Sequence, residues 1–256
     1  MNDRIERFLP WRNVWWWPRW KVPSFLMLHS VSDEVIDPYC PNNTIRPDEL
    51  RSLVMVLRKC GYRFKTFREA IETGDRKTVC LTFDDGYIDN YTNLFPILKE
   101  LDCPATCFVT NRGDATYPRK LWSSEDPIPK NAAFLTVDML REMESSGLFE
   151  FGGHTAGHTT LTRVSPEDAQ REIVTNKRWI ENALGHPIVS FSYPRGAEND
   201  AVVRLVKEAG YRYAAAMKKK MRPVDVDLFR IHRQIIPRGM ATWKSVLLAT
   251  RGRWKL

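Results

Sequence analysis

Residues 78–86 read Thr-Val-Cys-Leu-Thr-Phe-Asp-Asp-Gly, an apolar run that ends in two adjacent carboxylates and a glycine. The apolar part is typical of a buried strand, and side chains alternate between the two faces of a strand. Asp84 and Asp85 can therefore have different functions, because one can bind a metal while the other accepts a proton. Gly86 allows the sharp turn that follows. A surface Asp-Asp-Gly turn is the alternative for this stretch taken alone.

Two histidines, His154 and His158, stand four residues apart in a glycine-rich window. If this segment turns helically, residues four apart project to the same side. With one carboxylate they make a three-ligand site with an open position, the usual form of a catalytic zinc or similar divalent centre. The chain has only five histidines, which favours this interpretation over two solvated loop residues.

Three stretches together resemble the signature motifs of the polysaccharide deacetylases, carbohydrate esterase family 4. They are Thr-Phe-Asp-Asp-Gly-Tyr at 82–87, His-Thr-Ala-Gly-His at 154–158 and Phe-Ser-Tyr-Pro-Arg-Gly at 191–196, in the family's order and spacing. The resemblance runs from about residue 24 to about residue 237. It implies a single-domain α/β fold, a distorted (β/α) barrel with fewer than eight strands, and metal-dependent hydrolysis of an N-acetyl group on a sugar.

The resemblance also implies roles for individual residues. Asp85, His154 and His158 would bind one divalent metal ion, with zinc expected first and nickel, cobalt, manganese or iron as alternatives. Asp84 would be the general base. The backbone N–H of Arg195 would help to hold the oxyanion that forms when water attacks the acetyl carbonyl.

The third motif departs from the family pattern. Many members carry an arginine two residues before its proline, where it steadies the aspartate base, whereas this chain has Ser192. Arg195 stands where an aromatic residue is usual. Its side chain would either restore the lost charge or contact an anionic part of the substrate, and the sequence leaves both possibilities open.

A proton donor for the departing amine is expected on a histidine. Typical members place it near the C-terminus of the domain, after a Leu-x-His pattern. Members that resemble the poly-N-acetylglucosamine deacetylases have a permuted motif order, with this histidine on the first strand. Leu26–His29 matches the permuted version, so His29 is the first candidate and His232 the competitor. Either could instead be a hydrogen-bonded histidine at the end of a strand.

Strand and helix patterns alternate along the chain, which predicts a parallel sheet with its site at the carboxyl ends of the strands. Residues 111–134 lack periodicity, and so long an insertion is expected to be a functional loop that forms part of the substrate groove. The predicted strands are 24–28, 78–83, 105–110, 148–151, 188–191, 211–216 and 228–231, and the predicted helices are 46–60, 90–101, 137–146, 166–184, 200–209 and 240–249.

Composition indicates one globular domain inside the cell. An apolar fraction of 43% supplies a core, and the odd number of cysteines, five, without zinc-ribbon spacing, indicates reduced thiols in a cytosolic protein. Residues 1–21 lack the pattern of a signal peptide, and no segment approaches the ~20 apolar residues of a membrane span. We therefore expect a cytoplasmic protein.

Charge gathers at the two ends of the chain. Residues 1–21 carry +3 and residues 216–256 carry +9, which leaves −4 of the net +8 for the body. Five tryptophans among arginines lie within Trp11–Trp20, a combination favoured at the headgroup level of bilayers. The alternatives are rings that cover the bottom of the barrel or a dimer interface, and stacking on nucleic acid, for which no recognisable module is present.

These features predict three segments: a basic, tryptophan-rich segment at 1–22, a deacetylase-like barrel at 23–238 and a basic amphipathic segment at 239–256. The expected function is that of a cytoplasmic, peripheral-membrane N-deacetylase acting on a lipid-linked or precursor surface glycan. Removal of another acyl group, such as formyl, is the first alternative. A catalytically inactive glycan-binding protein is an alternative from another class, and nucleic acid is not an expected partner.

Overall fold

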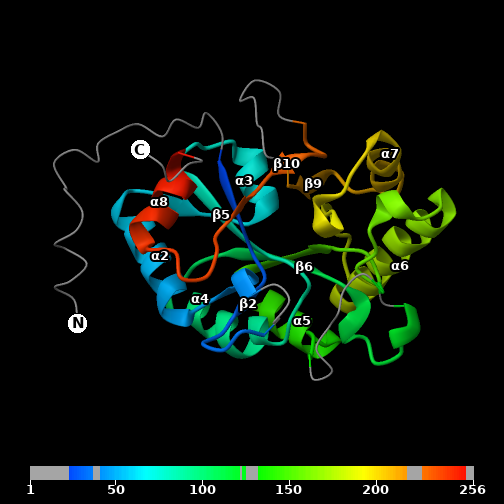
Figure 1. Ribbon diagram of the computed structural model, residues 1–256, viewed down its shortest axis with the longest axis horizontal. Helices are drawn as coiled ribbons and strands as arrows, with labels where there is room; N and C mark the ends of the chain where they lie inside the picture. Colours follow the sequence, from blue (N-terminus) through cyan, green and yellow to red (C-terminus); the bar gives the residue numbers. More distant parts are fainter. Residues whose placement is uncertain (1–22, 37–40, 122, 125–131, 218–226, 252–256) are drawn as a thin grey trace.

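The strands pair in parallel and curve into a barrel whose outer side is covered by helices (Figure 1). The structure is a computed structural model that describes residues 23–36, 41–121, 123–124, 132–217 and 227–251. The strands are β1 (Ser24–Leu28), β2 (Ser30–Val31), β3 (Thr44–Ile45), β4 (Arg63–Phe64), β5 (Thr78–Phe83), β6 (Ala105–Val109), β7 (Phe149–Gly153), β8 (Ser190–Ser192), β9 (Tyr213–Ala216), β10 (Ile231–His232) and β11 (Gln234–Ile235). The α-helices are α2 (Pro47–Lys59), α3 (Phe67–Thr73), α4 (Phe95–Glu100), α5 (Val137–Ser145), α6 (Pro166–Leu184), α7 (Asp200–Glu208) and α8 (Thr242–Arg251).

Residues 231–235 close the barrel. β10 pairs with β9, β11 pairs with β1, and only Arg233 separates these two short strands. The strand order is β10-β9-β8-β7-β6-β5-β1-β11, with β4 beside β5. Because β10 and β11 are separated by a single residue, they bring the two ends of this eight-strand path together. The expected distorted (β/α) barrel is confirmed, with eight strands on this path rather than fewer than eight.

Alternation along the strands separates an outer apolar layer from an inner one. Leu26 and Leu81 belong to the large cluster beneath the surrounding helices, whereas Phe25 and Cys80, their neighbours in sequence, belong to a second cluster inside the barrel. The same alternation continues just beyond the carboxyl ends of β1 and β5. There, the next residues whose side chains are expected to point into the barrel are His29 and Asp84.

Helix α3 fills the end of the barrel opposite these residues. Its first residue, Phe67, makes edge-to-face contacts with Phe25 and Phe108, with ring centroids 5.2 and 5.4 Å apart. The backbone N–H groups at its start donate to Thr106 Oγ1 at 2.8 Å and to Oε2 of the half-buried Glu150 at 2.9 Å. Aromatic packing therefore blocks one end, and only the other end is left for a site.

The structure corrects the predicted strand at 228–231, which begins three residues later and continues to Ile235. The reason is a turn initiated by Asp227, whose Oδ1 accepts from the N–H of Phe229 at 2.9 Å. The predicted helix at 90–101 is also corrected, because it starts as a π-helical turn over Asn90–Leu94. β4 and α3 were not predicted, whereas α6 has the predicted bounds, with Ser165 as its N-cap.

The predicted membrane-surface segment at 1–22 and the basic end at 252–256 lie outside the described residues. Helix α8 contacts α2 and β1, and buries Val246 and Ala249 against them. In the part of the chain that the structure describes, no helix combines the length and the apolar character needed to cross a bilayer.

Candidate metal centre and active site

Asp85, His154 and His158 come together at the carboxyl ends of β5 and β7. Asp85 Oδ1 lies 3.5 Å from Nε2 of His154 and 3.3 Å from Nε2 of His158. One candidate ligand atom from each residue lies within 4.8 Å of the others, and all three side chains are buried. The sequence-predicted ligand set is therefore gathered in one place.

These residues fit a divalent ion. Asp85 Oδ1 is buried without a hydrogen-bond partner, a costly state that a bound cation would relieve. Burial alone would raise the pKa of Asp85, but the adjacent His158 and His154 outweigh it and hold the pKa well below its ordinary value. One carboxylate oxygen with two imidazole nitrogens suits zinc or a similar metal.

The histidines converge through a strained loop rather than the helical turn considered from the sequence. The segment between them has no helical assignment, and Thr155 and His158 have φ values of 62° and 61°. Positive φ is unusual for any residue with a side chain, above all for a β-branched one. Asp85 is also left-handed, with φ 73°. Strain of this kind persists only where the surroundings impose it, and it gathers at functional sites.

Two neighbouring elements hold His154. Its Nδ1 lies 2.8 Å from the Ser192 carbonyl oxygen, so with that nitrogen protonated the ring directs Nε2 toward Asp85. Its backbone N–H donates at 2.8 Å to Oδ1 of Asn176 on α6. The Asn176 amide in turn donates to the carbonyl oxygen of Val109 at 3.0 Å and to Asn111 at 2.9 Å. The buried asparagine thereby ties the ends of β6 and β7 together.

Asp84 forms a bidentate ion pair with Arg233 instead of joining the three ligands. Arg233 Nη1 donates to Asp84 Oδ1 at 2.6 Å, and Nη2 donates to Oδ2 at 2.7 Å. Burial alone would raise the pKa of Asp84, but Arg233 and nearby His154 lower it below its ordinary value. The carboxylate is thus ionised and fixed in orientation.

Arg233 resolves the departure found in the third motif. Its Nη2 also donates to Ser192 Oγ at 2.8 Å, and Ser192 Oγ lies 3.3 Å from Asp84 Oδ2. The serine is small, and the arginine comes from another strand to supply the charge. Sequence reasoning missed Arg233 because the last strand was placed at 228–231. In the observed strand, Ile231 faces the inner cluster, and alternation from Ile231 places Arg233 inside the barrel.

The two candidate proton donors lie on opposite faces of the barrel. His29 is close enough to Asp85, Asp84 and His154 to interact with their charges, and burial lowers the pKa of its imidazole. His232 pairs in register with Ala216, which belongs to the outer cluster. Only His29 is therefore grouped with the predicted ligands and base.

Arg195 is exposed and has a left-handed backbone, with φ 58° and ψ 11°. It sits in the short turn Pro194–Gly196, which begins one residue beyond β8. This turn adjoins Ser192, whose carbonyl holds His154 and whose hydroxyl contacts Asp84. The arginine that pairs with Asp84 is Arg233.

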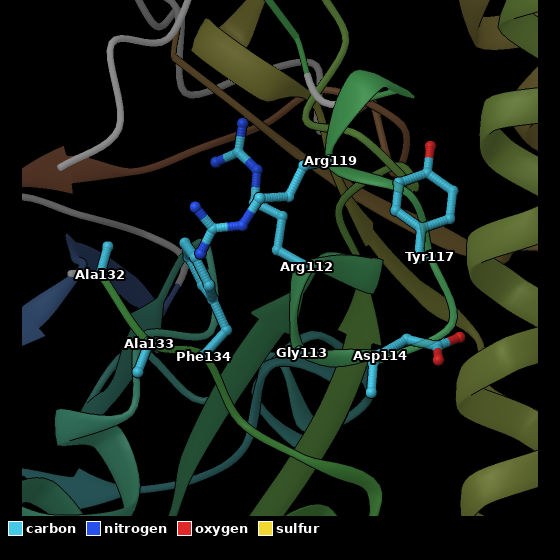
Figure 2. A pocket seen from close by; sticks show the side chains of 9 residues that line it. Arg112, Gly113, Asp114, Tyr117, Arg119, Ala132, Ala133 and Phe134 are labelled. Atoms are coloured by element: carbon cyan, nitrogen blue, oxygen red, sulfur yellow. The ribbon is translucent and has the colours of Figure 1, made fainter. Parts of the chain in front are cut away.

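The described parts of the insertion at 111–134 line a pocket of about 330 Å³ (Figure 2). The insertion is tied to both motif loops. Leu135 N–H donates to the Gly86 carbonyl at 2.8 Å, and Asn111 N–H donates to the Ala156 carbonyl at 3.0 Å. Both motif loops therefore bond to the segments that border the pocket.

Several known proteins are similar to this chain in sequence or in fold. The family model for polysaccharide deacetylase matches residues 71–214. A poly-β-1,6-N-acetyl-D-glucosamine N-deacetylase of Staphylococcus epidermidis is 26% identical over 227 residues, which span 83% of this chain and 73% of that protein. The deacetylase PplD of Streptococcus pyogenes, solved in complex with acetate, is 25% identical with a TM-score of 0.73, covering 90% of this chain and 97% of that one.

A polysaccharide deacetylase from Bacillus cereus shares the fold with a TM-score of 0.73 at 22% identity, over 90% of this chain and 69% of that one. The matched family region contains both carboxylates of the first motif, both histidines of the second and the whole third motif. The chain belongs to the polysaccharide deacetylase family.

Proposed function

We propose that the protein is a metal-dependent N-deacetylase acting on an amino sugar of a glycan. The observation that carries the proposal is that two adjacent carboxylates have different partners. Asp85 lies against two histidines, and Asp84 is held by Arg233. The similarity to a poly-β-1,6-N-acetyl-D-glucosamine N-deacetylase supports an N-acetylated polymer as the substrate class.

A divalent ion held by Asp85, His154 and His158 would supply Lewis-acid chemistry that acidifies water and polarises the acetyl carbonyl. Asp84 accepts the proton of the attacking water. Its pKa lies below the ordinary value, so it is available as a base at neutral pH. Arg233 holds both carboxylate oxygens, which fixes the direction in which the proton is received.

His29 would donate a proton to the amine nitrogen as the C–N bond breaks, so that acetate and a free amino sugar leave. The support for His29 is that both carboxylates, Asp85 and Asp84, act on the pKa of its imidazole. Arg233 is the one charge of the centre that acts on the pKa of His232 within the described chain. The backbone N–H of Arg195, in the turn after β8, would donate to the carbonyl oxygen as it gains negative charge.

A lipid-linked or precursor surface glycan, met at the cytoplasmic face of a membrane, is the substrate that the charge pattern favours. The support is the +9 charge of residues 216–256 and the tryptophan–arginine run at 11–20, since basic and aromatic side chains together favour anionic bilayers. The four described cysteines are free thiols, as in a reducing compartment.

Acetate release from β-1,6-linked N-acetylglucosamine oligomers tests the proposed activity. The zinc-loaded wild type is expected to release acetate, and Asp84→Asn to lose about 10²–10⁴-fold in kcat, because an amide of the same shape cannot accept the proton of water. Formate released from an N-formylated oligomer in preference to acetate would support the deformylase alternative. An Asp84→Asn variant that keeps more than about a tenth of wild-type kcat would remove Asp84 from the role of base.

The two histidine candidates are separated by paired alanine variants. His29→Ala is expected to lower kcat by about 10²-fold, whereas His232→Ala has a much smaller effect because its side chain lies on the outer face of the barrel. Steady-state kinetics on the same oligomer measures both variants. The opposite ranking would transfer the role of acid to His232.

Arg233 is expected to act through Asp84 as a positioning residue. Arg233→Gln removes the charge that lowers the pKa of Asp84, so that pKa rises, the base becomes protonated at higher pH, and the acidic limb of the kcat/KM profile moves upward. A loss of about 10–100-fold in activity is expected, with destabilisation of about 3–5 kcal/mol because Asp84 is left buried and unpaired.

Arg233→Lys is the matched variant, because it keeps the charge but not the bidentate geometry. It should leave the acidic limb nearer to that of the wild type while still lowering kcat. Thermal melts of both variants report the fold. A lysine variant whose kcat and pH profile equal those of the wild type would show that the bidentate pair does not position the base.

A further inference from the structure

The segment that carries His29 packs against one unusual turn. Directly after β1, His29 leads into β2, and β2 contacts the π-helical turn Asn90–Leu94. Asn90 is fully buried, and its Nδ2 donates to the carbonyl oxygen of His29 at 2.9 Å. π-Helical turns are rare and often occur at functional sites. This turn therefore has a direct bond to the residue proposed as proton donor.

Asp89, the residue before the turn, orients the Asn90 amide. Nδ2 of Asn90 also donates to Oδ1 of Asp89 at 3.0 Å, so the amide hydrogens have one acceptor each. Oδ2 of Asp89 accepts from the hydroxyl of Ser30, and the backbone N–H of Val31 donates to the same carboxylate. Asp89 is buried, which raises its pKa to about 6. A buried carboxylate is costly unless hydrogen bonds compensate for it, and here the compensating bonds join the turn to β2.

Hydrogen bonds hold the backbone on both sides of the His29 side chain. The carbonyl oxygen of Leu28, before it, accepts from the N–H of Asp84 at 3.0 Å. The carbonyl oxygen of His29 itself, after it, accepts from Asn90. The first bond ties His29 to the proposed base, and the second ties it to the π-helical turn. Because both peptide groups are held, the imidazole can move only about χ1 and χ2.

We propose that Asn90, oriented by Asp89, is a positioning residue for the proton donor His29. The proposal rests on the proposed deacetylase function and deepens its acid step. As the C–N bond breaks, the electron pair goes to the amine nitrogen, which takes a proton from the His29 imidazole. A displacement of about 1 Å in a reacting group can cost about 10²-fold in rate. The bond from Asn90 keeps the imidazole within reach of the amine.

Two substrates that differ in their leaving group separate positioning of the acid from a general loss of structure. The amine of an N-acetylglucosamine oligomer needs a proton in order to leave. para-Nitrophenyl acetate carries the same acetyl group, but its C–O bond breaks with the electron pair on the phenolate oxygen, which leaves as a stable anion without a proton. A variant in which only His29 is misplaced should therefore lose the first reaction and keep the second.

Asn90→Ala in the zinc-loaded protein is expected to lower kcat for acetate release from the oligomer by about tenfold and to hydrolyse the ester near the wild-type rate. Asn93→Ala is the matched control, because Asn93 Nδ2 donates to the carbonyl oxygen of Val31 at 2.7 Å. This variant removes the same kind of bond from the same turn, two residues beyond His29. It should keep the wild-type ratio of the two rates.

An equal loss of both reactions in Asn90→Ala, or no loss of either, would overturn the proposal. A selective loss of the same size in Asn93→Ala would also overturn it, because any loosening of the segment would then be sufficient. Thermal melts report whether each variant folds. If Asn90→Ala does not fold, Asp89→Asn takes its place, since it keeps the shape of the side chain but replaces one acceptor oxygen with a donor. The same selective loss is then expected, and an equal loss of both reactions contradicts it.

Crystal structures of the zinc-loaded wild type and of the variant that folds provide a readout that needs no turnover. A His29 side chain that is displaced in the variant supports the positioning role, even if the wild type releases no acetate from any acetylated glycan. That absence of acetate would overturn the proposed activity alone. A His29 side chain in its wild-type position would overturn the positioning role and leave the deacetylase function standing.

Discussion

The ion pair between Asp84 and Arg233 is the interaction on which the rest of the site depends. Both side chains are buried, so each needs the other: breaking such a pair costs about 3–5 kcal/mol. Arg233 reaches Asp84 only because residues 231–235 fit between β9 and β1. The same five residues therefore close the barrel and orient the carboxylate of Asp84, the proposed base. The same guanidinium contacts Thr82 and Ser192, which links the strands of the first and third motifs.

Around this pair, the fold imposes conformations that isolated loops would avoid. Asp85, Thr155 and His158 all have positive φ, and each such residue costs on the order of 1–3 kcal/mol. Buried Asn176 and the contacts of the 154–158 loop with α6 and Arg112 hold this geometry. The helices around the barrel therefore hold the loops of the candidate metal ligands as well as covering the core. The insertion shares this role, because Arg112 and Asn111 bond to the loop from outside.

Much of this arrangement could be predicted from the sequence, and the exceptions have physical causes. Local signals were sufficient for β1, β5 and α6, where apolar runs and a Ser-Pro cap mark the ends. The set Asp85, His154 and His158 was predicted from the resemblance to the deacetylase motifs, and the residues lie together because the carboxyl ends of parallel strands meet at one edge. Arg233 was missed because its inward position depends on where the last strand begins. The turn at Asp227 delays that start by three residues relative to the prediction. Helix α3 was missed because its packing inside the barrel is a tertiary contact that leaves no periodic signal in seven residues.

The central claim is that Asp85, His154 and His158 bind one divalent ion beside an independently held base. Zinc content after mild chelation and reloading tests it most directly, in the wild type, His154→Ala and His186→Ala. His186 is the matched control because it is exposed and contacts Glu144, away from the centre. The account predicts about one zinc per chain in the wild type and in His186→Ala, and a marked loss in His154→Ala. Equal stoichiometric occupancy in the wild type and His154→Ala would contradict it.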